Sequence, residues 1–99
     1  MNLIEKNIKE LKKLCIKFNV IQLYIFGSVL NEKFSDDSDI DFIVTFGNVE
    51  LNRYADNYFD FKFSLEDLFN RKIDVLEDKA IKNPFFRKTI DTSKKLIYG

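Results

Sequence analysis

Two runs of β-forming, almost entirely apolar residues constrain the fold of this chain most strongly. The first run, residues 20–26 (VIQLYIF), ends at Gly27, and the second, residues 40–46 (IDFIVTF), ends at Gly47. Continuous apolar runs of this length are typical of strands that are covered on both faces. A shorter run over residues 72–76 (KIDVL) predicts a third strand. The chain therefore has to build its layers around a small central sheet.

Segments with helical periodicity flank and separate these strands. In residues 2–19 apolar side chains recur at helical spacing, with lysines and glutamates on the other side, and residues 50–70 repeat this pattern. Near the C-terminus, Asn83-Pro84 is a typical helix start, with Asn as N-cap and Pro at the first helical position, for a helix to about Ser93. The basic residues of that last helix, beginning with Arg87, most simply form a solvated face.

This order of elements predicts one α/β domain over residues 1–99, in which helices pack against a small mixed sheet of three or four strands. The connection over residues 28–38 is shorter than a usual parallel crossover, so the first two strands should run antiparallel. The segment over residues 50–70 is long enough for a parallel, right-handed crossover into the third strand.

The composition excludes several classes of function. The chain has no histidine, which removes histidine bases, Ser-His triads and histidine-ligated zinc. Sixteen basic and sixteen acidic residues leave no net charge with which to hold a long nucleic acid. The single cysteine, Cys15, permits no internal disulfide, and its place on an apolar stripe predicts a core residue. With no apolar stretch of the ~20 residues that cross a membrane and no signal peptide, we expect a cytoplasmic protein.

Five residues predict a site for a metal ion and a phosphate. Asp39 and Asp41, at the start of the second strand, project from one face about 6.6 Å apart, because side chains alternate along a strand. Carboxylates this close raise each other's pKa, and a divalent cation such as Mg²⁺ resolves the conflict. Asp74 can join them if the third strand lies beside the second. Gly27 lets a ligand approach the backbone, and a helical turn opening at Ser28 favours an anion.

The same residues resemble a known family. Gly27-Ser28, ten further residues, Asp39 and Asp41, and a later acid at Asp74 look like the G-S-x10-D-x-D signature of the minimal nucleotidyltransferase (MNT) group of DNA polymerase β-like nucleotidyltransferases. The similarity covers nearly the whole chain. It implies the polymerase β-like core fold, triphosphate contacts from Gly27 and Ser28, and Mg²⁺ ligation by Asp39, Asp41 and Asp74, with Asp74 also helping to deprotonate the acceptor hydroxyl.

The resemblance also implies a reaction and a partner. Small MNT proteins are commonly antitoxins encoded beside a HEPN-domain toxin, which they neutralise by transferring AMP to one of its tyrosines. For this chain the resemblance implies an Mg²⁺-dependent adenylyltransferase that uses ATP as donor and the toxin as acceptor. In-line attack on the α-phosphate depends chiefly on positioning and charge neutralisation, so it needs no histidine. The sequence leaves the oligomeric state open.

Two features favour an alternative, an MNT protein with weak or no catalysis that neutralises its partner by binding alone. Where the family often reads G-S-R-A-R-G, this chain has Val29, Asn31 and Glu32 and so lacks two arginines and a glycine. Phe59 and Phe63 lie off the apolar stripe of their predicted helix, where they either cover a loop or form a surface for a partner. A small-molecule transferase is disfavoured, because so short a chain has little room for an acceptor pocket.

Overall fold

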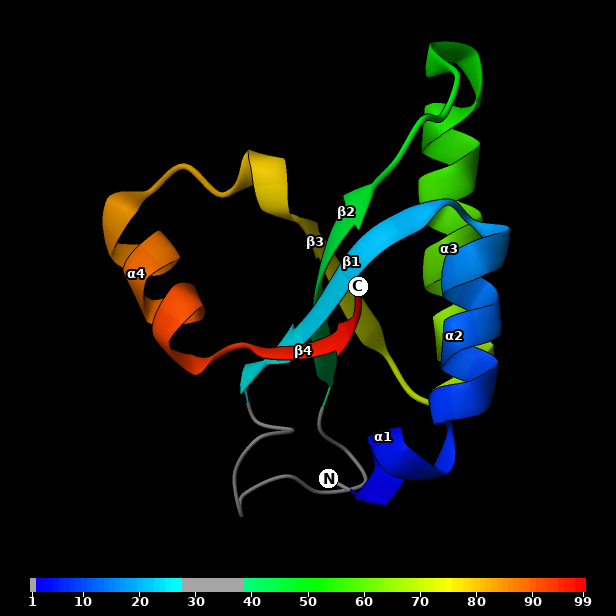
Figure 1. The fold of residues 1–99 in the computed structure, drawn as a ribbon, viewed down its shortest axis with the longest axis horizontal. Coiled ribbons are helices and arrows are strands. Elements are labelled where there is room, and N and C mark those ends of the chain that lie inside the picture. The colour runs from blue at the N-terminus through cyan, green and yellow to red at the C-terminus, as the bar shows by residue number, and fades with distance from the viewer. Residues whose placement is uncertain (1, 28–38) are drawn as a thin grey trace.

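The computed structural model describes residues 2–27 and 39–99 (Figure 1). Four strands form one sheet with helices on both sides, which is the mixed α/β fold that the sequence predicts. The elements are α1 (Asn2–Lys6), α2 (Ile8–Lys17), β1 (Val20–Phe26), β2 (Ile40–Phe46), α3 (Tyr54–Phe69), β3 (Ile73–Glu77), α4 (Pro84–Ser93) and β4 (Lys95–Tyr98), with the 3-10 turns η2 (Leu51–Arg53) and η3 (Asp78–Ala80). Every helix in these two stretches is too short or too polar to span a membrane.

The sheet has the strand order β3-β2-β1-β4. β1 runs antiparallel to β2 and β4, whereas β2 and β3 are parallel. Both predicted directions are confirmed, and α3 lies in the connection between the parallel strands β2 and β3. β4 is the fourth strand, which the sequence pattern left undecided, and it pairs with the outer edge of β1 through Tyr24 with Leu96 and Ile25 with Lys95.

The N-terminal segment forms two helices, so the prediction of one helix over residues 2–19 was wrong. The break lies at Asn7, whose side-chain amide donates to the Leu3 carbonyl at 2.9 Å. Such local bonds give the backbone an alternative to a continuous helix. The predicted end at Asn19 is confirmed, since α2 ends at Lys17 and Asn19 takes a φ of 58°, a left-handed conformation that asparagine tolerates.

α3 begins at Tyr54, later than the predicted start near residue 50. The 3-10 turn η2 precedes it, and Leu51 in this turn is exposed, although its position on the apolar stripe predicted burial. Phe61 is fully buried instead, together with Leu65 and Phe69. The buried face of α3 therefore runs through Phe61, Leu65 and Phe69, and Leu51 lies outside the core because it precedes the helix.

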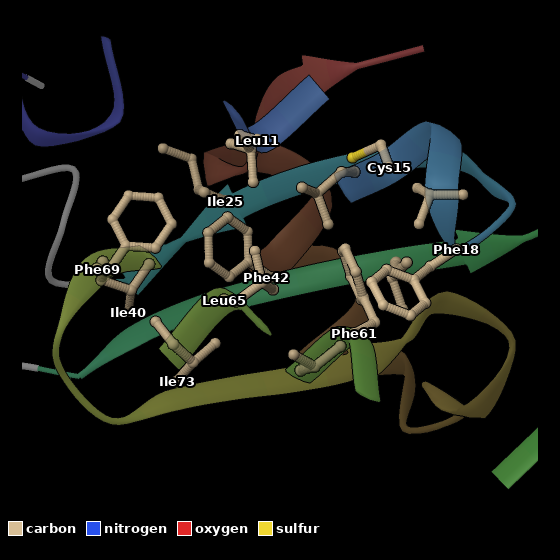
Figure 2. Packing of buried hydrophobic residues seen from close by; sticks show 14 of the residues in the cluster. Leu11, Cys15, Phe18, Ile25, Ile40, Phe42, Phe61, Leu65, Phe69 and Ile73 are labelled. Carbon is tan, nitrogen blue, oxygen red and sulfur yellow. The ribbon is translucent and has the colours of Figure 1, made fainter. Parts of the chain in front are cut away.

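The main hydrophobic core lies between the sheet and the helices α1, α2 and α3 (Figure 2). Cys15 is fully buried in it, which confirms its predicted role. The buried residues that Figure 2 labels are Leu11, Cys15, Phe18, Ile25, Ile40, Phe42, Phe61, Leu65, Phe69 and Ile73. Ile43 and Ile90 are buried outside this cluster, and α4 lies on the side of the sheet opposite α2 and α3 (Figure 1). The second face of the sheet is thus the face of α4.

Candidate active site

Two carboxylates face each other across neighbouring parallel strands. Asp41 on β2 is the direct register partner of Asp74 on β3, and on its other side it pairs with Phe26 on β1. Paired residues project from the same face of a sheet, and side chains alternate along each strand. Because Phe42 and Val75, the next residues along the two strands, pack into the main core, Asp41 and Asp74 project from the opposite face, on the side of α4. The structure therefore brings these two predicted site residues together.

The electrostatics of this pair are unfavourable for a second negative charge. The pKa of Asp41 is raised from 3.8 to about 6, mainly by burial and then by the charge of Asp74, a hydrogen bond with the Asp74 carboxyl, and the charge of Asp39. A hydrogen bond between two carboxyl groups requires a proton on one of them, so the ionised pair is destabilised where no cation lies near. A bound cation would relieve this repulsion.

Asp39 lies beside this pair and is itself paired with a lysine. It directly precedes β2, and its Oδ2 lies 3.8 Å from the Nζ of Lys72, which directly precedes β3. Both side chains are exposed enough for solvent to screen this ion pair, so it contributes little to stability. Within residues 2–27 and 39–99, no three acidic or cysteine side chains are arranged as a complete metal-binding group. Asp41 and Asp74 thus form the centre of the site, and Asp39 is adjacent to it.

The donor set of these aspartates fits a divalent cation. Carboxylate oxygens are the hard ligands that Mg²⁺ prefers, and this ion commonly takes one or two carboxylates and completes its shell with waters and substrate phosphates. Asp41 and Asp74 supply two such groups in register. Asp39 is the third candidate ligand, because its exposed pair with Lys72 is weak enough to exchange.

Gly27 brings the end of β1 close to the Asp41 carboxylate. Its φ is +83°, and a Cβ at this position would lie 2.7 Å from the Asp41 Oδ2. Glycine adopts this backbone conformation readily and has no side chain that would press on the carboxylate, so the backbone at the end of β1 stays accessible beside Asp41. Ser28, the second residue predicted to contact phosphate, lies outside the described residues. Residues 29–32, where this chain differs from the G-S-R-A-R-G pattern of the family, also lie outside them.

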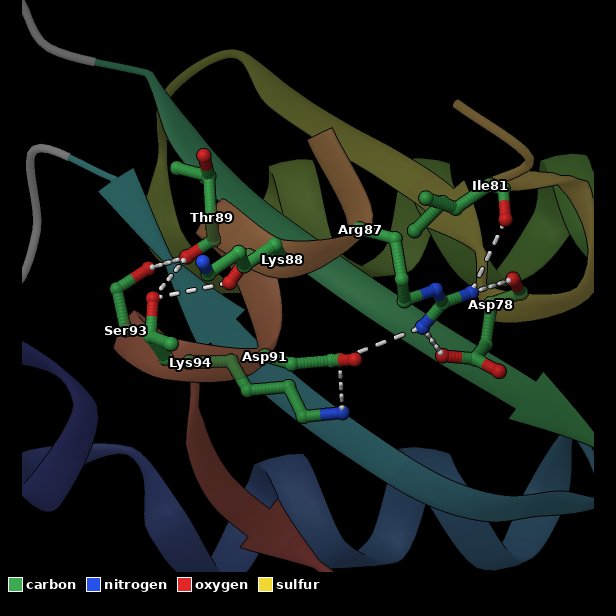
Figure 3. Close-up of polar contacts among 9 residues, drawn as sticks. Asp78, Ile81, Arg87, Lys88, Thr89, Asp91, Ser93 and Lys94 are labelled. Atoms are coloured by element: carbon green, nitrogen blue, oxygen red, sulfur yellow. Dashed lines mark hydrogen bonds and ion pairs between the residues drawn. The ribbon is translucent and has the colours of Figure 1, made fainter. Parts of the chain in front are cut away.

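Helix α4 borders the face that carries the carboxylates, a feature that the sequence interpretation missed. The ring of Phe86 contacts the ring of Phe26, with centroids 6.3 Å apart and an interplanar angle of 74°. Next to it, Arg87 donates through Nη1 to the Asp78 carboxylate at 2.8 Å and through Nη2 to the carbonyls of Asp78 at 2.6 Å and Ile81 at 3.2 Å (Figure 3). The prediction that Arg87 belongs to a solvated face was wrong, because it clamps α4 to the segment that follows β3.

Phe59 and Phe63 form an exposed aromatic pair on α3. Their rings stack with centroids 6.1 Å apart, and the side chains are 48% and 53% exposed. Phe59 also lines a shallow groove of about 380 Å³ together with Leu76 of the edge strand β3. Of the two roles that the sequence left open, this exposure favours a surface for a partner over the cover of a loop.

Known proteins are similar in sequence to this chain. A family model described as "Polymerase beta, Nucleotidyltransferase" matches residues 9–99. A relative from Methanocaldococcus jannaschii, named "Putative protein adenylyltransferase MJ0128", is 35% identical over 97 residues, which cover 98% of this chain and 91% of the relative.

Two solved structures share the fold at lower sequence identity. A toxin-antitoxin crystal structure with AMP-PNP matches with a TM-score of 0.71 and 19% identity, covering 94% of this chain and 73% of the other. A structure of a tri-AMPylated Shewanella oneidensis HEPN toxin in complex with an MNT antitoxin matches with a TM-score of 0.66 and 18% identity, covering 96% and 71%. The family match includes Gly27 and all three aspartates, and this chain belongs to the polymerase β nucleotidyltransferase family.

Proposed function

We propose that this chain is an Mg²⁺-dependent protein adenylyltransferase, which transfers AMP from ATP to a hydroxyl group of a HEPN-domain toxin and so acts as its antitoxin. The observation that carries the proposal is the pair of carboxylates, Asp41 and Asp74, in direct register beside Gly27. The name of the Methanocaldococcus jannaschii relative and the toxin-antitoxin complexes that share the fold support the choice of nucleotide and partner.

Each predicted site residue has a role in this proposal. Gly27 and Ser28 contact the triphosphate at the end of β1, where Gly27 leaves the backbone accessible. Asp39, Asp41 and Asp74 hold Mg²⁺, which when bound neutralises charge on the phosphates. Asp74 also helps to deprotonate the acceptor hydroxyl, a role that the family resemblance implies and that its position in register with Asp41 allows.

The transfer itself exchanges one phosphorus–oxygen bond for another. The hydroxyl oxygen of the acceptor bonds to the α-phosphorus of ATP, and the bond from that phosphorus to the oxygen bridging to the β-phosphate breaks. Pyrophosphate leaves with the bonding electron pair, and the hydroxyl proton passes to a carboxylate oxygen of Asp74. Such a reaction depends on aligned reactants and on charge neutralisation, and it requires no histidine.

Transfer of a radioactive label tests the proposal. The purified protein is mixed with ATP labelled at the α-phosphate, Mg²⁺ and the product of the neighbouring gene, and label on that product is measured after electrophoresis. We expect labelling by the wild type and loss of labelling by Asp41→Asn. Asp56→Asn, on the exposed surface of α3, is the matched control and should label like the wild type. Equal background labelling by wild type and Asp41→Asn would contradict the proposal.

A second candidate function is neutralisation by binding alone, and the exposed pair of Phe59 and Phe63 favours it. A stacked aromatic pair on a surface beside a groove is typical of a protein interface. In that case toxin neutralisation survives in the variant Asp39→Asn with Asp41→Asn and is lost in Phe59→Ser with Phe63→Ser. Loss of neutralisation in the aspartate variant, with the complex still formed on a sizing column, would contradict binding alone.

A further inference from the structure

Phe86 is an exposed aromatic residue that touches the wall of the proposed site. Although its ring packs edge-on against Phe26, with centroids 6.3 Å apart, the side chain remains 42% exposed. Phe26 directly precedes Gly27 and is the register partner of Asp41. The two rings therefore lie on the same face of the sheet as the carboxylates, one strand away from Asp41.

The position of Phe86 is fixed by the residues around it. The side chain of Asn83 caps α4 and accepts hydrogen bonds from the backbone amides of Phe85 and Phe86, at 2.9 and 3.1 Å. On the other side, Arg87 ties the first turn of α4 to the Asp78 carboxylate and to two carbonyl oxygens (Figure 3). A ring held in this way can offer a surface to a ligand at a small cost in side-chain entropy.

We propose that the ring of Phe86 is the stacking surface for the nucleobase of the nucleoside triphosphate. This inference rests on the proposed nucleotidyltransferase function, which places the triphosphate beside Gly27 and the carboxylates. The ribose then separates the base from the phosphates, and α4 is the element that borders this face of the sheet. Base stacking on an aromatic ring contributes substantially to binding and is tolerant of base identity, because every base has a π-face. Stacking alone therefore predicts weak discrimination between ATP and GTP.

Binding of two probes separates stacking from a purely structural role. Dissociation constants for ATP and for inorganic tripolyphosphate, which has no base, are measured by titration calorimetry in the presence of Mg²⁺. Phe86→Leu keeps an apolar contact with Phe26 but has no aromatic ring, so it should weaken ATP binding roughly tenfold and leave tripolyphosphate binding unchanged. Phe86→Tyr keeps a ring and should bind ATP like the wild type.

The adjacent Phe85 is the matched control. It lies on the same helix turn and is 82% exposed, and Phe85→Leu should change neither dissociation constant. Unchanged ATP binding in Phe86→Leu, or an equal loss for ATP and tripolyphosphate, would overturn the stacking role while the transferase proposal stands. Absence of ATP binding in the wild type would overturn both proposals.

Discussion

Replacing Gly27 with alanine tests how closely β1 approaches the Asp41 carboxylate. Gly27 has a φ of +83°, and a left-handed conformation costs a residue with a Cβ about 1–2 kcal/mol. Alanine also reduces the conformational freedom of the unfolded chain, and this offsets ~0.4–1 kcal/mol of that cost. The backbone contribution is therefore a loss of about 1 kcal/mol in the free energy of unfolding.

The new Cβ would also overlap the Asp41 Oδ2, which lies only 2.7 Å from its ideal position. This oxygen is at the end of a side chain, so rotation of Asp41 relieves the overlap at low cost in stability. The rotation, however, moves the carboxylate away from its place beside Asp74. A displacement of about 1 Å in an active site can lower the reaction rate about 100-fold. We therefore expect a variant that folds well and transfers AMP poorly.

Two measurements check this expectation. Urea denaturation in EDTA gives the change in the free energy of unfolding, and transfer of α-labelled AMP gives the change in rate. Gly47→Ala is the control, because Gly47 has no left-handed φ and the nearest contact of its new Cβ would be Ile21 Cγ1 at 3.3 Å. It lies at the other end of the β1–β2 pair and should leave the transfer rate unchanged.

Two results would refute this reasoning. Wild-type activity in Gly27→Ala would show that the new methyl group does not disturb the carboxylate. A double-mutant cycle with Asp41→Ala gives the second result. If the contact is with Asp41, removing that carboxylate should leave only the backbone cost of about 1 kcal/mol. An equal cost above this value in both backgrounds would place the clash elsewhere.

The remaining predictions concern Asp41, the core and the Arg87 clamp. The pKa of Asp41 is about 6 in the folded protein, against an ordinary value of 3.8. Protonation of Asp41 therefore stabilises the metal-free fold fully below pH 3.8, and this stabilisation is lost as the pH rises through 6. Urea denaturation should show that the free energy of unfolding falls by about 1–2 kcal/mol from pH 3.8 to pH 6, a value already reduced for the partial exposure of the Asp41 carboxyl. The same measurement on Asp41→Asn should show no such fall, which would confirm Asp41 as its source. Phe61→Ala should lower the free energy of unfolding by about 3–5 kcal/mol, because the ring is fully buried. Phe63→Ala, on the exposed face of the same helix, should lower it by less than about 1 kcal/mol. Equal losses of stability in thermal unfolding would be inconsistent with this difference in burial. Arg87→Lys keeps the charge but cannot make the forked contacts with Asp78, so amide hydrogen exchange in α4 should accelerate, and unchanged exchange would argue against the clamp.

The strands were predictable because their signal is local. β1 and β2 match the predicted runs residue for residue, because each is a continuous run of β-forming residues that ends at a glycine. The expected cover on both faces holds for most of β2, whereas in β1 Ile21 is exposed and Tyr24 is only half-buried. β4 has only four residues, of which Lys95 and Leu96 are exposed, and it is held by pairing with β1 far away in the sequence. A short, half-exposed strand of this kind has no periodicity to detect, and its stability comes from the sheet that it joins.

The candidate site was predictable in part for the same reason. The spacing of Asp39 and Asp41 and their position at the start of β2 can be read from the sequence, but the register that sets Asp74 opposite Asp41 depends on the parallel crossover through α3. Phe86 was not predictable as a neighbour of the site, nor Arg87 as the clamp on Asp78, because both positions depend on the packing of α4 on the sheet. Periodicity reports which side of a helix is apolar, and it says nothing of which strand end the helix covers.

The difference between the two faces of the sheet explains how so small a protein can tolerate a repelling pair of carboxylates. One face is closed by α1, α2 and α3 over a large apolar cluster, which supplies most of the hydrophobic stabilisation. On the other face the fully buried Ile43 and Ile90 lie where α4 packs, while Asp41 and Asp74 lie only partly buried towards the end where β1 stops at Gly27. Because the carboxylates are confined to that end, their repulsion does not act in the hydrophobic core. It acts at the partly exposed end of the sheet, where the proposed cation and phosphate would bind. Moving the pair two residues along the strands, to Ile43 and Leu76, would bring one carboxylate to a fully buried position, where an unpaired charge costs far more. The position of the site at the strand ends therefore follows from the same free-energy balance that places the core.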